Sequence, residues 1–170
     1  MNNSPIQKED VVSDTLSKYS MVKNTPPPES EYYLMQFDGL SAPNPGLSTS
    51  AAVIFSPDGT PIREVAHFII HATNNEAEYG GVILGLETAI KMGIKNILIE
   101  GDSQLVIYQI EGRWKGKEPR MIALSNIAKS LLASFRNVGV RHVPRANNKY
   151  ADKLTNEACQ KRAGFDRVLK

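Results

Sequence analysis

The chain has 170 residues, of which 41% are hydrophobic, so it is long enough for one domain with a substantial core. Its net charge of +2 permits nucleic-acid binding without arguing for it, because non-specific binders usually carry a basic stripe. The single cysteine excludes an intramolecular disulfide, and no apolar run fits a membrane span or a secretory signal. We therefore expect an intracellular protein with no membrane partner.

The first 30 residues differ in composition from the rest of the chain. They are polar and end in three successive prolines, which favour an extended, solvated backbone. This pattern predicts a flexible N-terminal tail or linker over residues 1–30. We expect one folded domain over 31–164 and a short C-terminal tail over 165–170.

The folded part begins with three strands joined by turns and continues with alternating helices and strands. Short apolar runs predict strands over 32–37, 49–55, 62–70, 95–101 and 138–143. Helical periodicity and capping residues predict helices over 76–92, 102–110, 117–137 and 147–163. This order predicts an α/β fold with a mixed five-stranded sheet. Three antiparallel strands come first, parallel strands are then added, and helices cover both faces.

Four acidic residues, Asp38, Glu78, Asp102 and Asp152, lie where a predicted strand ends or a predicted helix begins. Each alone has an ordinary structural explanation, such as a turn, a helix cap or a solvated helix position. All four can converge on one end of the sheet, where they would repel one another unless cations were bound. Oxygen ligands favour Mg²⁺, whereas one cysteine and three scattered histidines offer no zinc site.

The segments that carry these residues resemble the signatures of a known family. FDG with NPG, TNNEAEY, GDSQLV and RHVPRANNKYAD are similar to the four signature segments of type 1 ribonuclease H, in its compact variety without a basic protrusion. The resemblance covers about residues 32–162. It implies a ribonuclease H-like fold and cleavage of the RNA strand of RNA–DNA hybrids, leaving 5′-phosphate and 3′-hydroxyl ends. It also implies two Mg²⁺ ions, with Mn²⁺ as a substitute.

The resemblance assigns roles to individual residues. Asp38, Glu78, Asp102 and Asp152 match the catalytic carboxylates that hold the metal ions. The neighbouring Glu76 is expected to face solvent instead. The positions that match substrate contacts are Gly39, Asn44, Thr73, Asn74, Asn75 and Gln104. Contacts to ribose 2′-hydroxyls would distinguish RNA from DNA without reading the sequence.

Several points stay open at this stage. An auxiliary catalytic role falls to His142, whose segment reads as a strand, or to Arg145, which we favour. The stretch 110–123 is too short for a basic protrusion, so binding of the hybrid should be salt-sensitive. Double-stranded RNA is a second possible substrate, and we expect a monomer. The alternative function is a catalytically silent module that binds hybrids or double-stranded RNA.

Overall fold

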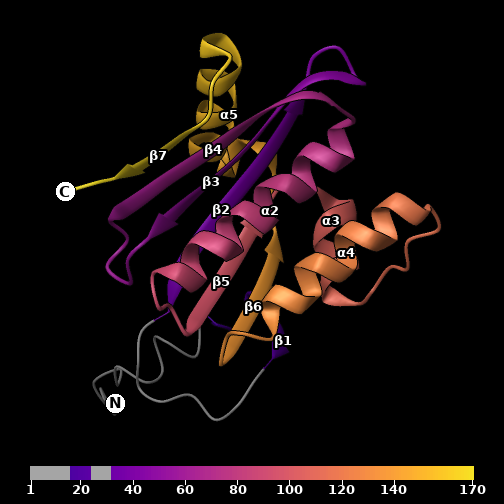
Figure 1. Ribbon diagram of the computed structural model, residues 1–170. Coiled ribbons are helices and arrows are strands. Elements are labelled where there is room, and N and C mark those ends of the chain that lie inside the picture. The colour runs from indigo at the N-terminus through magenta and orange to yellow at the C-terminus, as the bar shows by residue number, and fades with distance from the viewer. Residues whose placement is uncertain (1–15, 24–31) are drawn as a thin grey trace, which may run out of the picture.

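The computed structural model in Figure 1 describes residues 16–23 and 32–170. In this part of the chain, seven strands form one mixed sheet in the order β1-β6-β5-β2-β3-β4-β7. The strands are β1 (Ser20–Lys23), β2 (Tyr33–Ser41), β3 (Gly46–Phe55), β4 (Pro61–Ala72), β5 (Asn96–Gly101), β6 (Asn137–His142) and β7 (Phe165–Val168). The α/β ribonuclease H-like architecture is confirmed, with two strands more than predicted.

The centre of the sheet has the predicted topology. Strands β2, β3 and β4 form an antiparallel meander, because short turns join each to the next. Strand β5 pairs in parallel with β2 and with β6, with Phe37 opposite Gly101 and Gly101 opposite His142. Parallel neighbours end at the same edge of a sheet, so the ends of β5 and β6 meet beside the middle of β2.

Helices cover both faces of the sheet. They are α2 (Asn74–Lys91), α3 (Gln104–Glu111), α4 (Pro119–Leu132) and α5 (Lys149–Lys161), and a 3₁₀ turn, η1 (Arg145–Asn147), precedes α5. Side chains alternate along β3: Ala52 and Ile54 pack with α2, α3 and α4, whereas Ala51 and Val53 pack with α5. None of the helices in the described ranges has the length and apolar character needed to cross a bilayer.

Two short strands lie where the sequence predicts tails. Residues 20–23 form β1, which pairs antiparallel with β6, and residues 165–168 form β7, which pairs antiparallel with β4. The expected flexible tails are therefore wrong for these eight positions. Each strand has only four residues and depends on a partner far away in the sequence, so local composition carries little signal for it. The remainder of the predicted linker, 1–15 and 24–31, lies outside the described residues.

Strand β1 is fitted to the sheet by a glycine and by a buried carboxylate. A Cβ atom at Gly139 would lie 3.0 Å from Tyr19 Cβ and 3.1 Å from Met21 Sδ, so the missing side chain makes room for β1. The Tyr19 hydroxyl donates a hydrogen bond of 2.6 Å to Glu100 Oε2. The other oxygen of Glu100 accepts a hydrogen bond of 2.9 Å from Gln36. The N-terminal strand is thus tied to the strands that form the centre of the sheet.

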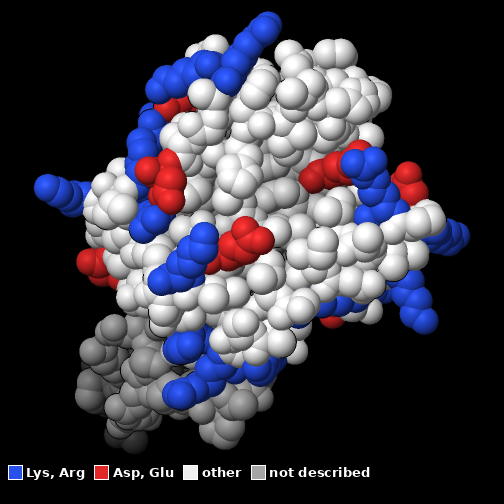
Figure 2. Space-filling model, in the orientation of Figure 1, with Lys and Arg blue, Asp and Glu red and all other residues white. Residues whose placement is uncertain are grey.

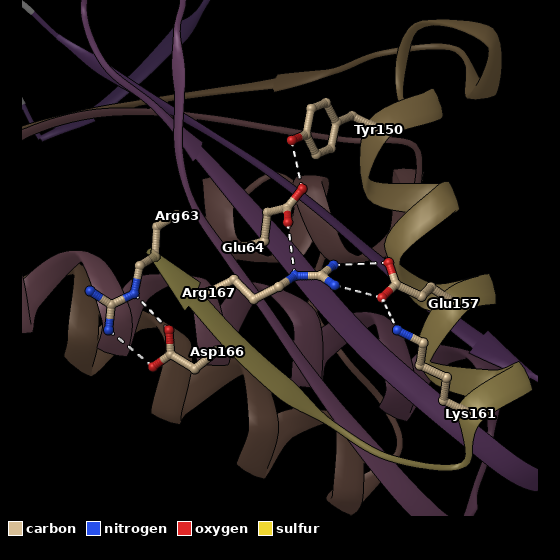
Figure 3. A network of polar contacts seen from close by, with 7 residues as sticks. All are labelled: Arg63, Glu64, Tyr150, Glu157, Lys161, Asp166 and Arg167. Carbon is tan, nitrogen blue, oxygen red and sulfur yellow. Dashed lines mark hydrogen bonds and ion pairs between the residues drawn. The ribbon is translucent and has the colours of Figure 1, made fainter. Parts of the chain in front are cut away.

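Strand β7 is held by ion pairs to β4 and α5 (Figure 3). Arg63 of β4 makes a bidentate contact with Asp166. Arg167 lies between two carboxylates, with Nε 3.0 Å from Glu64 Oε1 and two hydrogen bonds to Glu157 of α5. Exposed ion pairs contribute little singly, but a guanidinium shared by two elements fixes their relative position. The network therefore fastens α5 to the far edge of the sheet.

The hydrogen bond between Tyr19 and Glu100 gives a stability prediction. We expect Tyr19→Phe to lower the free energy of unfolding by about 1 kcal/mol, because a largely buried carboxylate loses a donor. Urea unfolding of the purified protein measures this change. Tyr33→Phe is the matched control, since the structure gives the Tyr33 hydroxyl no hydrogen-bond partner among the described residues. Equal losses in the two variants would contradict the proposed anchor.

Candidate active site

Three carboxylates from three different elements meet at one point. Asp38 lies within β2, Asp102 directly follows β5, and Glu78 projects from the second turn of α2. Each offers an oxygen atom within 4.8 Å of the oxygens of the other two. The parallel pairing of β2 with β5 explains the first two, since Phe37 and Gly101 are partners and the acidic residues come next in each strand.

Two glycines bring Glu78 to this point. A Cβ atom at Gly39 would lie 2.2 Å from Glu78 N, and one at Gly81 would lie 2.6 Å from the Asp38 carbonyl oxygen. Real Cβ atoms do not approach other atoms so closely, so any larger residue at either position would push α2 away from β2. The close crossing of helix and strand therefore depends on both glycines.

Helix caps set the direction of the neighbouring side chains. Thr73 caps α2: its hydroxyl accepts from Glu76 N, and its own backbone N–H donates to the Glu76 carboxylate, which confirms the predicted N-cap segment. The N-cap of α3 is Ser103, whose hydroxyl accepts from Val106 N. Asp102 is therefore not the capping residue, although the sequence allows that role, and its carboxylate is directed to the cluster instead.

The cluster strongly disfavours negative charge in the absence of cations. Burial, followed by the charge of Asp102, raises the pKa of Asp38 to about 7. Burial, followed by the charges of Asp38 and Asp102, raises the pKa of Glu78 to about 10. The pKa of Asp102 is also raised, chiefly by burial. Removal from water and mutual repulsion act together at one place.

The residues fit a divalent metal ion. Glu78 Oε2 is buried and has no hydrogen-bond partner among the described residues, as expected for an oxygen that acts as a metal ligand. Hard cations such as Mg²⁺ take carboxylate oxygens as ligands. Their charge would offset the mutual repulsion that, together with burial, raises the pKa values of these carboxylates. This acidic cluster is therefore a metal-binding site by its donor set and by its electrostatics.

Asp152, the fourth predicted carboxylate, lies at the rim of the cluster. It occupies the first turn of α5, as predicted, but is not among the three residues whose oxygens lie within 4.8 Å of one another. Its charge still raises the pKa values of Asp38 and Asp102. Oδ1 of Asp152 lies 3.6 Å from the guanidinium of Arg145, whose side chain is 79% exposed.

The two candidates for the auxiliary role lie on the same side of the cluster. Arg145 begins η1, and His142 is the last residue of β6, half-buried against the ring of Tyr108. The charges of both side chains lower the pKa of Asp102. Position alone does not separate them, so their roles stay a prediction.

Most of the predicted substrate contacts line one shallow pocket of about 390 Å³. Its walls include Asn44, Thr73, Asn74 and Asn75. Asn44 Oδ1 accepts from the Asn74 backbone, and Asn74 Oδ1 accepts from the Ser41 backbone. These bonds occupy the carbonyl oxygens of both amide groups, and within the described part of the chain the NH₂ donors have no partner and are available to a ligand.

The two other predicted contacts lie elsewhere. Gln104 begins α3 and lies 3.3 Å from the hydroxyl of Tyr108. Gly39 lies under α2, where its backbone N–H lowers the pKa values of Asp38 and Glu78 against the larger effect of burial. The backbone of Gly39 therefore both permits the close approach of α2 and favours the ionised form of the two carboxylates.

Glu76 corrects one prediction. It does not face solvent: its side chain is only 14% exposed, and its Oε2 lies 2.5 Å from Nε of Arg120. Arg120 lies in the first turn of α4, so a helix that is distant in sequence contributes a positively charged side chain to the pocket. Neither this pairing nor the Tyr108–Trp114 ring contact at 4.9 Å was predicted. The pairing depends on how α4 packs beside α2, and the ring contact depends on the turn that follows α3.

Comparison with known proteins gives consistent results. The family model described as reverse transcriptase-like matches residues 36–158. Ribonuclease HI of Halobacterium salinarum is 43% identical over 122 residues, which cover 72% of this chain and 61% of that protein. A bifunctional protein of Mycobacterium tuberculosis is 42% identical over 126 residues, which cover 74% of this chain but only 35% of that protein. The chain thus spans between about a third and three-fifths of these relatives' lengths.

Solved structures show the same fold. The crystal structure of RNase H1 from Halobacterium salinarum has a TM-score of 0.74 at 40% identity, covering 76% of this chain and 98% of that chain. The N-terminal ribonuclease H domain of a Mycobacterium tuberculosis protein has a TM-score of 0.74 at 40% identity, covering 79% and 100%. LC11-RNase H1, solved in complex with an RNA/DNA hybrid, has a TM-score of 0.72 at 29% identity, covering 76% and 98%.

The mixed sheet and the acidic cluster beside β2 and β5 define a nuclease-like site on a ribonuclease H-like fold. Together with the matched family model and the structural relatives, they give the protein's family. This chain belongs to the reverse transcriptase-like family and is a homologue of the type 1 ribonucleases H.

The raised pKa values predict how stability depends on pH without metal. The folded protein binds protons at Asp38 more tightly than the unfolded chain does, so stability falls as the pH rises from about 4 to about 7. We expect Asp38→Asn to increase the free energy of unfolding at pH 8 in EDTA, by on the order of 2 kcal/mol, with little gain at pH 4.

Urea unfolding at the two pH values measures this difference. Glu87→Gln removes one negative charge from an exposed position of α2 and serves as the control. A gain of the same size at pH 4 and pH 8 would show that charge repulsion at Asp38 is not its cause.

Proposed function

We propose that this protein is an endoribonuclease that hydrolyses the RNA strand of RNA–DNA hybrids, leaving 5′-phosphate and 3′-hydroxyl ends. The observation that carries this proposal is the group of three carboxylates, Asp38, Glu78 and Asp102, whose oxygens lie within 4.8 Å of one another. The likeness to ribonuclease HI of Halobacterium salinarum supports the reaction, and the LC11 complex supports the substrate.

The cofactor that we propose is a pair of Mg²⁺ ions, for which Mn²⁺ can substitute. Asp38, Glu78 and Asp102 would hold them, with Asp152 contributing from the rim. When bound, two such ions would activate a water molecule and stabilise the leaving oxygen of a phosphodiester. The raised pKa values of Asp38 and Glu78 support this proposal, because a bound cation would stabilise the ionised carboxylates.

The pocket beside the cluster is suited to the minor groove of a hybrid. The free amide donors of Asn44 and Asn74 can bond to ribose hydroxyls or phosphate oxygens, and Thr73 and Asn75 line the same surface. Gln104 would approach from α3 on the other side of the cluster. Such contacts recognise A-like duplexes with 2′-hydroxyls, so double-stranded RNA is a second candidate substrate.

Few basic side chains are available to contact the hybrid in this proposal. The connection between α3 and α4 comprises only residues 112–118, which leaves no room for a basic protrusion. On the face shown in Figure 2, basic and acidic side chains are interspersed among uncharged ones and form no continuous basic stripe. We therefore expect modest affinity that falls with salt. The three carboxylates of the cluster meet within one chain, so the proposed reaction requires no second copy, and we propose a monomer.

Cleavage of an end-labelled RNA–DNA hybrid in Mg²⁺ or Mn²⁺ tests the proposal directly. We expect cutting of the RNA strand, none in EDTA, and at least a 1000-fold loss of rate in Asp38→Asn, on the order of 4 kcal/mol in transition-state stabilisation. Matched DNA and RNA duplexes define the breadth of the activity. Activity retained in Asp38→Asn would refute the assignment.

The same assay distinguishes the alternative function. A folded protein that binds the hybrid in a gel-shift experiment but does not cut it with either metal would be a catalytically silent binding module. The three carboxylates argue against a silent module, because binding of a hybrid alone does not require buried acidic groups that repel one another.

The auxiliary role predicts unequal effects of two substitutions. We expect Arg145→Ala to lower kcat about tenfold, because its guanidinium faces Asp152 beside the cluster, and His142→Ala to lower it less. Steady-state cleavage of the hybrid measures both. Lys129→Ala, on an exposed face of α4, controls for the loss of one positive charge. If neither substitution lowers kcat more than this control, no auxiliary group lies at these positions.

A further inference from the structure

Thr155 is a buried hydroxyl that touches the proposed metal site from the opposite face of the sheet. It lies on α5, has no exposed surface, and places Oγ1 3.1 Å from Asp38 Oδ2. Asp38 is itself only 5% exposed. A hydrogen bond between two buried groups from different elements fixes the orientation of both.

The hydroxyl of Thr155 has one proton and two acceptors within reach. Besides Asp38 Oδ2, the carbonyl oxygen of Asp152 lies 2.8 Å away within the helix. That carbonyl already accepts a hydrogen bond of 2.8 Å from the side chain of Asn156. The ionised Asp38, the form that would hold a cation, is the stronger acceptor, since hydrogen bonds to ionised groups are about twice as strong as neutral ones. The proton is therefore directed to Asp38.

The position of Thr155 is fixed by further bonds between α5 and the sheet. Thr49 of β3 donates a hydrogen bond of 2.9 Å to the Thr155 carbonyl oxygen. Asn148, which precedes α5, donates one of 2.9 Å to the carbonyl oxygen of Phe37, the residue before Asp38. These contacts hold the hydroxyl at a constant place relative to β2, as a side chain that orients a ligand requires.

We propose that Thr155 is a positioning residue that holds one oxygen of Asp38, so that this carboxylate faces the metal site together with Glu78 and Asp102. The inference rests on the proposed function only in taking Asp38 as a metal ligand. Groups that orient metal ligands typically contribute 10- to 100-fold to metal affinity. We expect a loss of at least tenfold in affinity for Mn²⁺ when the hydroxyl is removed.

The test compares variants of the whole chain by calorimetric titration with MnCl₂ or MgCl₂. Thr155→Val keeps the shape of the side chain but has no hydroxyl, and Thr155→Ala lacks the hydroxyl without filling the space. Both should bind Mn²⁺ at least tenfold more weakly than the wild type. Thr155→Ser retains the donor and should recover most of the affinity lost in Thr155→Val. The metal concentration for half-maximal cleavage should change in the same order.

Thr88→Val separates positioning from general stability. Thr88 is also a buried threonine, but its hydroxyl donates a hydrogen bond of 2.8 Å to the Leu84 carbonyl oxygen within α2 and has no carboxylate partner among the described residues. The substitution should leave Mn²⁺ affinity near that of the wild type. Wild-type affinity in either Thr155→Val or Thr155→Ala would overturn the proposal, as would an equal loss in Thr88→Val.

The calorimetric readout keeps this inference distinct from the proposed nuclease activity. A wild-type protein that binds Mn²⁺ but does not cut the hybrid would refute the activity, while the affinities of the Thr155 variants would still decide the positioning role. A wild-type protein that binds neither metal at millimolar concentration would overturn both.

Discussion

The close crossing of α2 over β2 is the constraint on which the site depends. Gly39 and Gly81 allow backbone to meet backbone, and only at that separation does Glu78 reach the carboxylate of Asp38. A glycine inside a helix costs about 1 kcal/mol relative to alanine. The burial of α2 against β2 and β3 offsets this cost. The packing that forms the core therefore also brings the carboxylates of the site together.

The carboxylates are held from both faces of the sheet. On one face, α2 brings Glu78 down onto β2. On the other face, Asn148 before α5 donates a hydrogen bond to the Phe37 carbonyl oxygen, and Thr49 of β3 donates one to the Thr155 carbonyl oxygen in α5. A cluster of like charges would spread apart if its supports were loose, because burial and then mutual repulsion disfavour the ionised carboxylates, as their raised pKa values indicate. Rigid supports on two faces therefore hold the ligands in place before any cation arrives.

The parts of the fold that local sequence encodes were predictable. Strands β2 to β6 have apolar runs bounded by turns, α2 begins with recognisable capping residues, and the four acidic segments show a family pattern. The features that were missed depend on distant partners. Thr155 meets Asp38 across 117 positions, and Glu76 meets Arg120 only because α4 packs beside α2. The residues next to Thr155 and Glu76 in the sequence give no sign that these two side chains differ from surface residues.

The two edge strands change what the boundaries of the family mean for this molecule. The matched segment, residues 36–158, contains neither β1 nor β7. A chain cut to that segment would leave β4 and β6 with unpaired backbone groups along their outer sides, which invite pairing between molecules. It would also separate Glu100 from Tyr19 and Glu157 from Arg167. The segment that the family model matches is thus smaller than the unit that forms the seven-stranded sheet.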